Sequence, residues 1–290
     1  MATNNHVGNP FEYFLDRLGG GLAGIFRPHD DTAARAAARI QPQVRRIGAA
    51  DLRDALKAGL ADFVAARDDV LFIAIVYPLA GLLLAVFALQ HALLPMIFPL
   101  VSGFAILGPL AAVGLFEISR RRERGEDVSW ADAAKVLASP ALGAIVAMGL
   151  VLIALFGLWL VTAYQISLMA FAGRPPETVE GLVQTVFAAG HGGTMLVIGA
   201  VIGFGFAAVA LAISVVAFPL LLDRKVDVDV AIRTSLRVVA ANPGTMALWG
   251  LIVAAALVIG SLPALVGLIV VMPVLGHATW HLYRKAVAPA

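Results

Sequence analysis

The chain has 290 residues, of which 60% are hydrophobic and only 14% are charged. In soluble proteins roughly a quarter of all residues are charged, so this composition excludes an ordinary soluble domain and indicates helices buried in lipid. The net charge of +2 is too small to indicate a nucleic-acid partner. Because cysteine is absent, disulfides, thiolate metal sites and cysteine nucleophiles are excluded.

The first 48 residues are predicted to form a cytoplasmic tail. Apolar residues between Phe11 and Phe26 recur with helical spacing, but each glycine among them weakens a helix by about 1 kcal/mol relative to alanine. We therefore expect this stretch to become helical only against a membrane surface. Residues 27–48 are predicted to form a flexible linker.

An amphipathic helix is predicted next, leading into the first membrane span. Its apolar stripe, at helical spacing, consists of Leu52, Leu56, Leu60, Phe63 and Val64. The opposite, polar face carries Arg53, Asp54, Lys57 and Asp62. Such a helix is expected to lie along the membrane interface.

Six stretches are long and apolar enough to cross a hydrocarbon core about 30 Å thick as helices. They cover residues 70–90, 92–116, 141–171, 194–222, 245–261 and 263–282. The fold class predicted from them is an all-α membrane protein, with its membrane domain over residues 49–287.

Lysine and arginine predict the orientation, because basic loops stay in the cytoplasm. The N-terminal tail carries nine of them, the loops after spans two and four carry five and four, and the C-terminus carries two. Arg174 is the single basic residue in the alternate loops. Both termini are therefore predicted to be cytoplasmic. The preference for Arg over Lys, 17 to 4, indicates a bacterial chain and hence the inner membrane.

The predicted elements recur three times. A capping box, Ser129 with Asp132, predicts a short helix before the third span, and a further amphipathic helix is predicted over Asp229–Ala241 before the fifth. Each of the three helices precedes two spans, which suggests three pseudo-repeated hairpins. Hairpins with basic ends can also look alike by chance. Prolines are expected to bend the second span of each pair, and they are Pro109, Pro219 and Pro273.

Several segments together resemble a known family. They are Phe98–Pro109, Gly114–Trp130, Pro219–Arg224, Thr234–Arg237 and Gly276–Arg284. Over about residues 44–287 the chain resembles the bacterial family called domain of unknown function 2189. The resemblance implies a multi-span inner-membrane protein and supplies no established activity.

One set of residues has the chemistry of a metal site. His277 and His281 are four residues apart and therefore share one helix face near the cytoplasmic boundary, and Glu117 occupies the corresponding step of span two. Together they could hold a metal ion or a haem if these spans pack together. The structural alternative is a belt of polar and aromatic side chains at the headgroups, which we favour.

The neighbouring charges favour a structural role. Glu117 and the arginines Arg120–Arg122 are expected to pair with Asp223, Arg224 or Arg284 across the spans, which would clamp the cytoplasmic ends of the hairpins. Small residues over Gly199–Ala207 are expected to form a close-packing seam, inside the chain or with a second copy.

The function is predicted mainly from what the spans lack. Between their ends they lack Asp, Glu, Lys, Arg and His, although ion-coupled transporters place such groups at membrane depth. No nucleotide fingerprint or Ser/His/Asp arrangement is present either, so no enzyme is expected.

Three functions remain open. The first is a structural or accessory subunit that assembles a membrane complex, with the lipid bilayer and a membrane protein or a second copy as partners. The second is a carrier or channel for a small, weakly polar or lipid-like solute. The third is a metal- or haem-binding membrane protein that uses His277 and His281.

Overall fold

The computed structural model describes residues 41–65, 94–171, 178–188, 190–263 and 265–289, together with Leu79, Leu82, Leu83, Val86 and Pro176. Every regular element in this part of the chain is helical, and a single isolated β-bridge joins Val44 to Val287. The N-terminal stripe and nearly all of the first predicted span, residues 70–90, lie outside the described residues.

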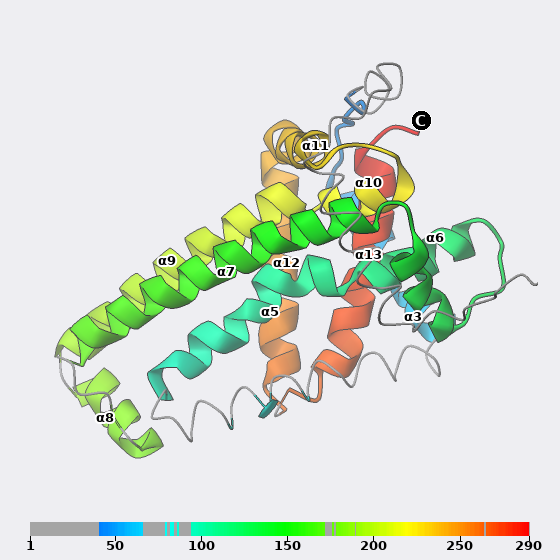
Figure 1. Cartoon of the computed structure of the whole chain (residues 1–290). Helices are drawn as coiled ribbons and strands as arrows, with labels where there is room; N and C mark the ends of the chain where they lie inside the picture. Colours follow the sequence, from blue (N-terminus) through cyan, green and yellow to red (C-terminus); the bar gives the residue numbers. More distant parts are fainter. Residues whose placement is uncertain are drawn as a thin grey trace, which may run out of the picture.

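The helices are α3 (Ala49–Ala65), η1 (Leu94–Met96), α5 (Ile97–Ala111), α6 (Val113–Glu123), η2 (Trp130–Ala138), α7 (Leu142–Ala170), α8 (Val179–Ala188), α9 (Gly190–Ser214), α10 (Ala217–Asp223), α11 (Val228–Ala241), α12 (Pro243–Ser261) and α13 (Leu268–Ala286). In Figure 1, α7 and α9 run side by side as the two longest helices, while α3, α6, α10 and α13 gather at one end of the molecule.

Four stretches of the described helices are long and apolar enough to cross a membrane. They are Leu94–Glu123, Leu142–Ala170, Leu196–Asp223 and Pro243–Ser261. They correspond to the predicted spans two to five. Helix α13 begins at Leu268, five residues later than the predicted sixth span, because the chain after α12 first turns through Leu265, whose φ is +68°. The count of six spans therefore stays a prediction.

Two of the spans are interrupted near their prolines. The second is divided at Ala112, three residues after Pro109, and the fourth at Val215–Val216, shortly before Pro219. Pro219 lies in the first turn of α10, where its missing N–H leaves no hydrogen bond unmade. Helix α13 continues through Pro273 without a break in its helical assignment. The three prolines thus have different local effects.

The predicted amphipathic helices are confirmed as helices. Helix α3 contains the stripe that starts at Leu52, and α11 covers the third predicted helix. The second is a 3₁₀-helix, η2, with the predicted capping box at its start: the N–H of Ser129 donates to Oδ2 of Asp132 over 2.8 Å. Each of the three precedes a predicted span.

Asn242 fixes the start of α12 to the segment before α3. Its Oδ1 accepts from the N–H of Ile47 over 2.8 Å, and its Nδ2 donates to the carbonyl of Arg45 over 3.1 Å. The N–H of Arg45 in turn donates to the carbonyl of Ala286 over 2.8 Å. These backbone partners hold the N-terminal end of α3 against the C-terminal end of α13.

Candidate functional site

Most of the charged contacts of the described helices lie at one end of the bundle. This end, which we call the charged end, is formed by α3, α6, η2, α10 and the C-terminal half of α13 (Figure 1). The arginines Arg120–Arg122 end α6, and Arg284 with Lys285 ends α13, where cations favour the negative end of the helix dipole. The side chains that could carry chemistry are therefore concentrated at the charged end.

Asp62 forms the centre of a first cluster that joins three helices. Its Oδ2 accepts from the Ser119 hydroxyl over 2.6 Å and lies 2.8 Å from Nε2 of His281, while its Oδ1 accepts from Nε of Arg122 over 3.0 Å. Nδ1 of His277 lies 2.8 Å from the Ser119 oxygen. We call these five residues the Asp62 cluster. The sequence predicted Asp62 on the polar face of its helix; in the structure α13 packs over this side chain and leaves it buried.

The hydrogen bonds of this cluster define where its protons lie. The ionised carboxylate of Asp62 can only accept, so the Ser119 hydroxyl donates to it and is free to accept from Nδ1–H of His277. In a nucleophilic triad the histidine stands between the serine and the carboxylate. Here Ser119 stands in the middle and its hydroxyl donates to the carboxylate of Asp62, so His277 is not placed to take that proton. The arrangement is a chain of hydrogen bonds that links the helices.

The charge of Asp62 is stabilised in place. Burial by itself would raise the pKa of Asp62, but the hydrogen bonds from His281 and Ser119 outweigh it and lower the pKa below its ordinary value. An ionised, buried carboxylate with three donors therefore holds α3, α6 and α13 together.

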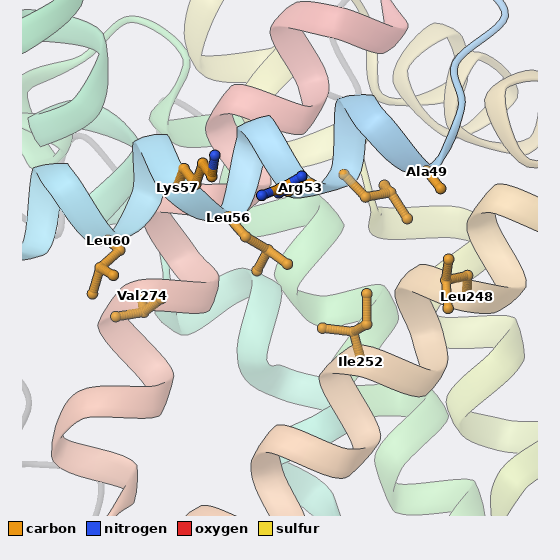
Figure 2. A pocket seen from close by; sticks show the side chains of 9 residues that line it. Ala49, Arg53, Leu56, Lys57, Leu60, Leu248, Ile252 and Val274 are labelled. Atoms are coloured by element: carbon orange, nitrogen blue, oxygen red, sulfur yellow. The ribbon is translucent and has the colours of Figure 1, made fainter.

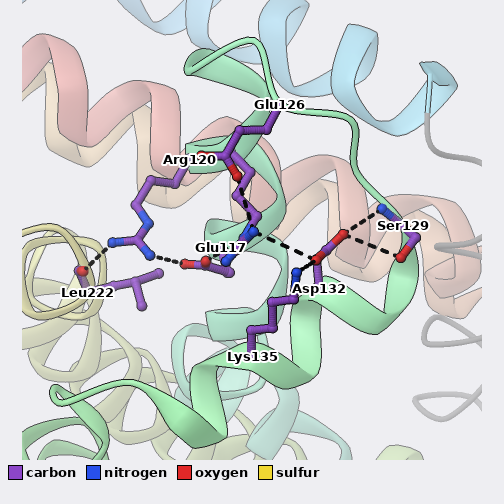
Figure 3. Close-up of polar contacts among 8 residues, drawn as sticks. Glu117, Arg120, Glu126, Ser129, Asp132, Lys135 and Leu222 are labelled. Atoms are coloured by element: carbon purple, nitrogen blue, oxygen red, sulfur yellow. Dashed lines mark hydrogen bonds and ion pairs between the residues drawn. The ribbon is translucent and has the colours of Figure 1, made fainter.

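Glu117 belongs to a second cluster, shown in Figure 3. Its carboxylate is buried and forms ion pairs with Arg120 over 2.6 Å and with Arg121 over 2.7 Å on the same helix. Arg120 also donates to the carbonyl of Leu222 over 3.0 Å, which joins α6 to α10. Arg121 extends to Glu126 over 3.1 Å. Glu117 thus pairs with arginines of its own helix, and among the described residues neither it nor Arg120–Arg122 forms the predicted pairs with Asp223, Arg224 or Arg284.

Asp132 links the same cluster to η2. It accepts from the Ser129 N–H and forms an ion pair with Lys135 over 2.5 Å, and Arg121 lies 3.7 Å away (Figure 3). The hydrogen bonds from Lys135 and from Ser129 lower the pKa of Asp132 to about 2. This residue therefore stays ionised at any physiological pH.

A third set of contacts joins α6, α10 and α13. The Tyr283 hydroxyl donates to Asp223 over 2.6 Å, and Arg284 bridges Asp223 at 3.5 Å and Glu123 at 2.9 Å. The indole N–H of Trp280 donates to Glu123 over 3.1 Å. Arg284 does pair across the helices, but its partners are Asp223 and Glu123 rather than the predicted Glu117.

The metal-site residues are divided between these clusters. His277 and His281 do lie together, held by Ser119 and Asp62, whereas Glu117 is engaged by Arg120 and Arg121. Within the described ranges no group of three or more His, Asp or Glu side chains is arranged to hold a metal ion. Nε2 of His277 is buried without a hydrogen-bond partner among the described residues.

The charged end depends on a close approach of α3 to α13. A Cβ atom at Gly59 would lie 2.5 Å from the backbone nitrogen of Ala278, so only glycine fits there. This approach is what brings Asp62, one turn later, within reach of His281. The sequence offered no signal for Asp62 or Ser119, because their partners lie 57 to 219 residues away along the chain.

Residues 97–223 match the sequence model of a family described as "Predicted integral membrane protein (DUF2189)". The match runs from the start of α5 to the end of α10, and over this stretch it confirms the resemblance. No curated protein and no solved structure matches the chain. With its four long apolar helices, the chain is an integral membrane protein.

Proposed function

Since residues 97–223 carry the pattern of an integral membrane family, we propose that this chain is a non-enzymatic subunit that helps to assemble or stabilise a membrane complex. It is a multi-pass protein of a bacterial inner membrane, with six spans and with both termini in the cytoplasm. In this proposal the charged end is a rigid base and the apolar helices present a surface to a partner.

The observation that carries the proposal is the closed pairing of the charged end. The buried carboxylates of Asp62 and Glu117 are each matched by arginine, and Asp132 by Lys135. Such pairs are strongly destabilised when one member is removed, so they fix the helices relative to one another. Charged groups that are paired in this way suit a structural role better than the exchange of protons or the binding of a substrate.

The α7–α9 hairpin supplies the surface. Only 6% of the most apolar window of the span Leu196–Asp223 is buried within the structure, against 28% for Leu142–Ala170. Its exposed apolar side chains include Val197, Val201 and Phe204. Lipid can cover such a face, but so can a helix of another protein, because helices in membranes associate by close packing.

Charge and element order support the topology. The basic residues that end α6 and α13 meet at one end of the molecule, together with Arg224 just after α10, as expected if that end faces the cytoplasm. Helices α3, η2 and α11 each stand before a predicted span, in keeping with three pseudo-repeated hairpins. Helix α8 lies between the two long spans α7 and α9, on the outer side in this topology.

The experiment is co-purification from the native membrane. The tagged full-length chain is extracted in mild detergent, and the proteins that accompany it are identified by mass spectrometry. The proposal predicts a defined set of membrane proteins in stoichiometric amounts. A chain that purifies alone in several detergents would contradict it.

A pair of variants locates the partner surface. Val201→Ala with Phe204→Ala trims the open face of α9, and we expect it to lower the recovered partner at least severalfold. The matched control is Leu251→Ala with Val258→Ala, which trims equally exposed side chains on α12. Equal recovery with both variants would exclude the α9 face as the docking surface.

A further inference from the structure

A second feature of the charged end is an apolar groove beneath α3. It has a volume of about 390 Å³ and lies between α3, α12 and α13. Its walls are almost wholly apolar side chains, chiefly Leu52, Leu56, Leu60, Leu248, Ile252 and Val274. In Figure 2, α3 crosses α13 and lies beside the first half of α12, and Leu56 and Leu60 reach from it toward those helices. The amphipathic helix α3 thus covers an apolar groove between itself, α12 and α13.

Two cations border this groove. Arg53 and Lys57 line it, and both side chains are exposed. In Figure 2 their nitrogen atoms stay at the level of α3, while the leucines of the same helix point below it. Neither cation forms an ion pair with any residue that the structure describes. Their charge is therefore available to a ligand.

The acidic residues of α3 do not neutralise these cations, because they are engaged elsewhere. Asp51 and Asp54 both pair with Lys285 of α13, at 3.3 and 3.2 Å, and Asp62 belongs to the buried cluster. The free charge on the groove side of α3 is thus positive. A positive rim beside an apolar groove is complementary to an amphiphile with an anionic head and a hydrocarbon tail.

We propose that this groove binds one anionic phospholipid of the cytoplasmic leaflet. One acyl chain lies along Leu56, Ile252 and Val274, and the headgroup phosphate lies between Arg53 and Lys57. Basic residues near a membrane surface each contribute about 1 kcal/mol to binding anionic lipid, and basic pockets beside membrane helices select such headgroups. The bound lipid would fill the space between α3 and α12.

The test uses the delipidated full-length protein and native mass spectrometry of bound lipid. Phosphatidylglycerol and phosphatidylcholine of identical acyl chains are added separately, so that the headgroup charge is the single difference. The proposal predicts one retained phosphatidylglycerol and a weaker occupancy by phosphatidylcholine. Equal occupancy by both lipids would overturn it.

Two charge variants separate the groove from general surface attraction. Arg53→Gln with Lys57→Gln should weaken phosphatidylglycerol binding about thirtyfold, or about fivefold for each cation, and leave phosphatidylcholine unchanged. Lys225→Gln with Arg233→Gln removes the same net charge from exposed sites outside the groove and should change binding less than about twofold. An equal loss in both double variants would mean diffuse attraction only and would overturn the site.

A further pair tests the acyl chain. Leu248→Trp fills the groove from a partly exposed position and should reduce the retention of both lipids. Leu251→Trp adds the same bulk to a more exposed position of α12 that does not line the groove, and it should reduce neither. Unchanged retention in Leu248→Trp would overturn the acyl site. This proposal does not rest on the accessory function, because a protein that purifies without partners can still retain the lipid.

Discussion

The charged end and the α7–α9 hairpin are stabilised by opposite means. At the charged end, the buried carboxylates of Asp62 and Glu117 are paired with partly exposed arginines. In the hairpin, the described contacts are apolar: a Cβ at Gly203 would lie 2.9 Å from Trp159, whose ring also packs against Phe206 at 5.6 Å. The predicted small-residue seam of α9 therefore includes a close contact inside the chain.

This difference predicts where substitutions should change the stability of the protein most. Polar pairs at the charged end have no replacement partner when one member is lost, because they are shielded from water. Side chains that face outward from the hairpin can exchange one apolar contact for lipid at little cost. We therefore expect large effects at the charged end and small ones along the hairpin.

The largest effect is expected from Asp62→Ala. It leaves Arg122 and His281 without their carboxylate and Ser119 without its acceptor, so the free energy of unfolding should fall by about 3–5 kcal/mol. Unfolding in detergent, followed by circular dichroism, measures this. Asp229→Ala removes one member of an exposed pair and should change stability by less than about 1 kcal/mol. Similar losses of stability in both variants would contradict a special role for the buried pairs of the charged end.

The next effect compares two glycines. Gly59→Ala places a methyl group against the backbone of Ala278 and should destabilise the protein by about 1–3 kcal/mol. Gly157→Ala, in α7, meets no atom within 4 Å and should stabilise by up to about 1 kcal/mol through helix propensity. Thermal unfolding midpoints of the two variants should move in opposite directions. A shift of the same sign in both would contradict the close packing of α3 on α13.

A smaller effect is expected where the hairpin meets α5. The indole N–H of Trp159 donates to the Ser102 hydroxyl over 2.8 Å, so Trp159→Phe should lose about 1 kcal/mol. Tyr164→Phe, at a half-exposed position of the same helix, should change stability by less than about 0.5 kcal/mol. Chemical denaturation of both variants decides whether this contact holds the hairpin.

A further effect is expected from pH. The folded pKa of Asp62 and that of Asp132 are both lowered, the latter to about 2, so each stabilises the fold above its ordinary pKa of 3.8. That stability should be lost as the pH falls from about 4 toward 2. Asp132→Asn should flatten this part of the stability profile, measured as the unfolding midpoint at successive pH values. An unchanged slope would mean that Asp132 is not paired in the folded state.

The sequence predicted the elements that depend on local pattern. The third span, predicted at residues 141–171, is α7 over Leu142–Ala170, because an unbroken apolar run defines its own limits. The Ser129 capping box was recognised because both partners lie within one turn. Local spacing therefore sufficed for helix positions and for one helix start.

The sequence did not predict the contacts that depend on packing. Asp62 was placed on a polar face, because hydrophobic periodicity describes a single helix and takes no account of its packing partner. That partner is α13, whose His281 lies 219 residues further along the chain. Glu117 was predicted to share a metal site with the two histidines because it occupies the corresponding step of its span. Its carboxylate instead pairs with the arginines at i+3 and i+4 on its own helix. The break at Val215–Val216 was also not located, because Pro219 marks a bend only to within a turn.

The orientation of the charged end is the claim on which the other proposals depend, and the lack of cysteine allows a direct test. Single cysteines replace Glu180 in α8 and Lys225 beside α10, both at exposed positions. Intact bacterial cells with a permeabilised outer membrane are treated with a maleimide that cannot cross the inner membrane. Labelling of Glu180→Cys in these cells, with labelling of Lys225→Cys only after lysis, is the predicted result. Labelling of both, or of Lys225→Cys alone, would contradict it.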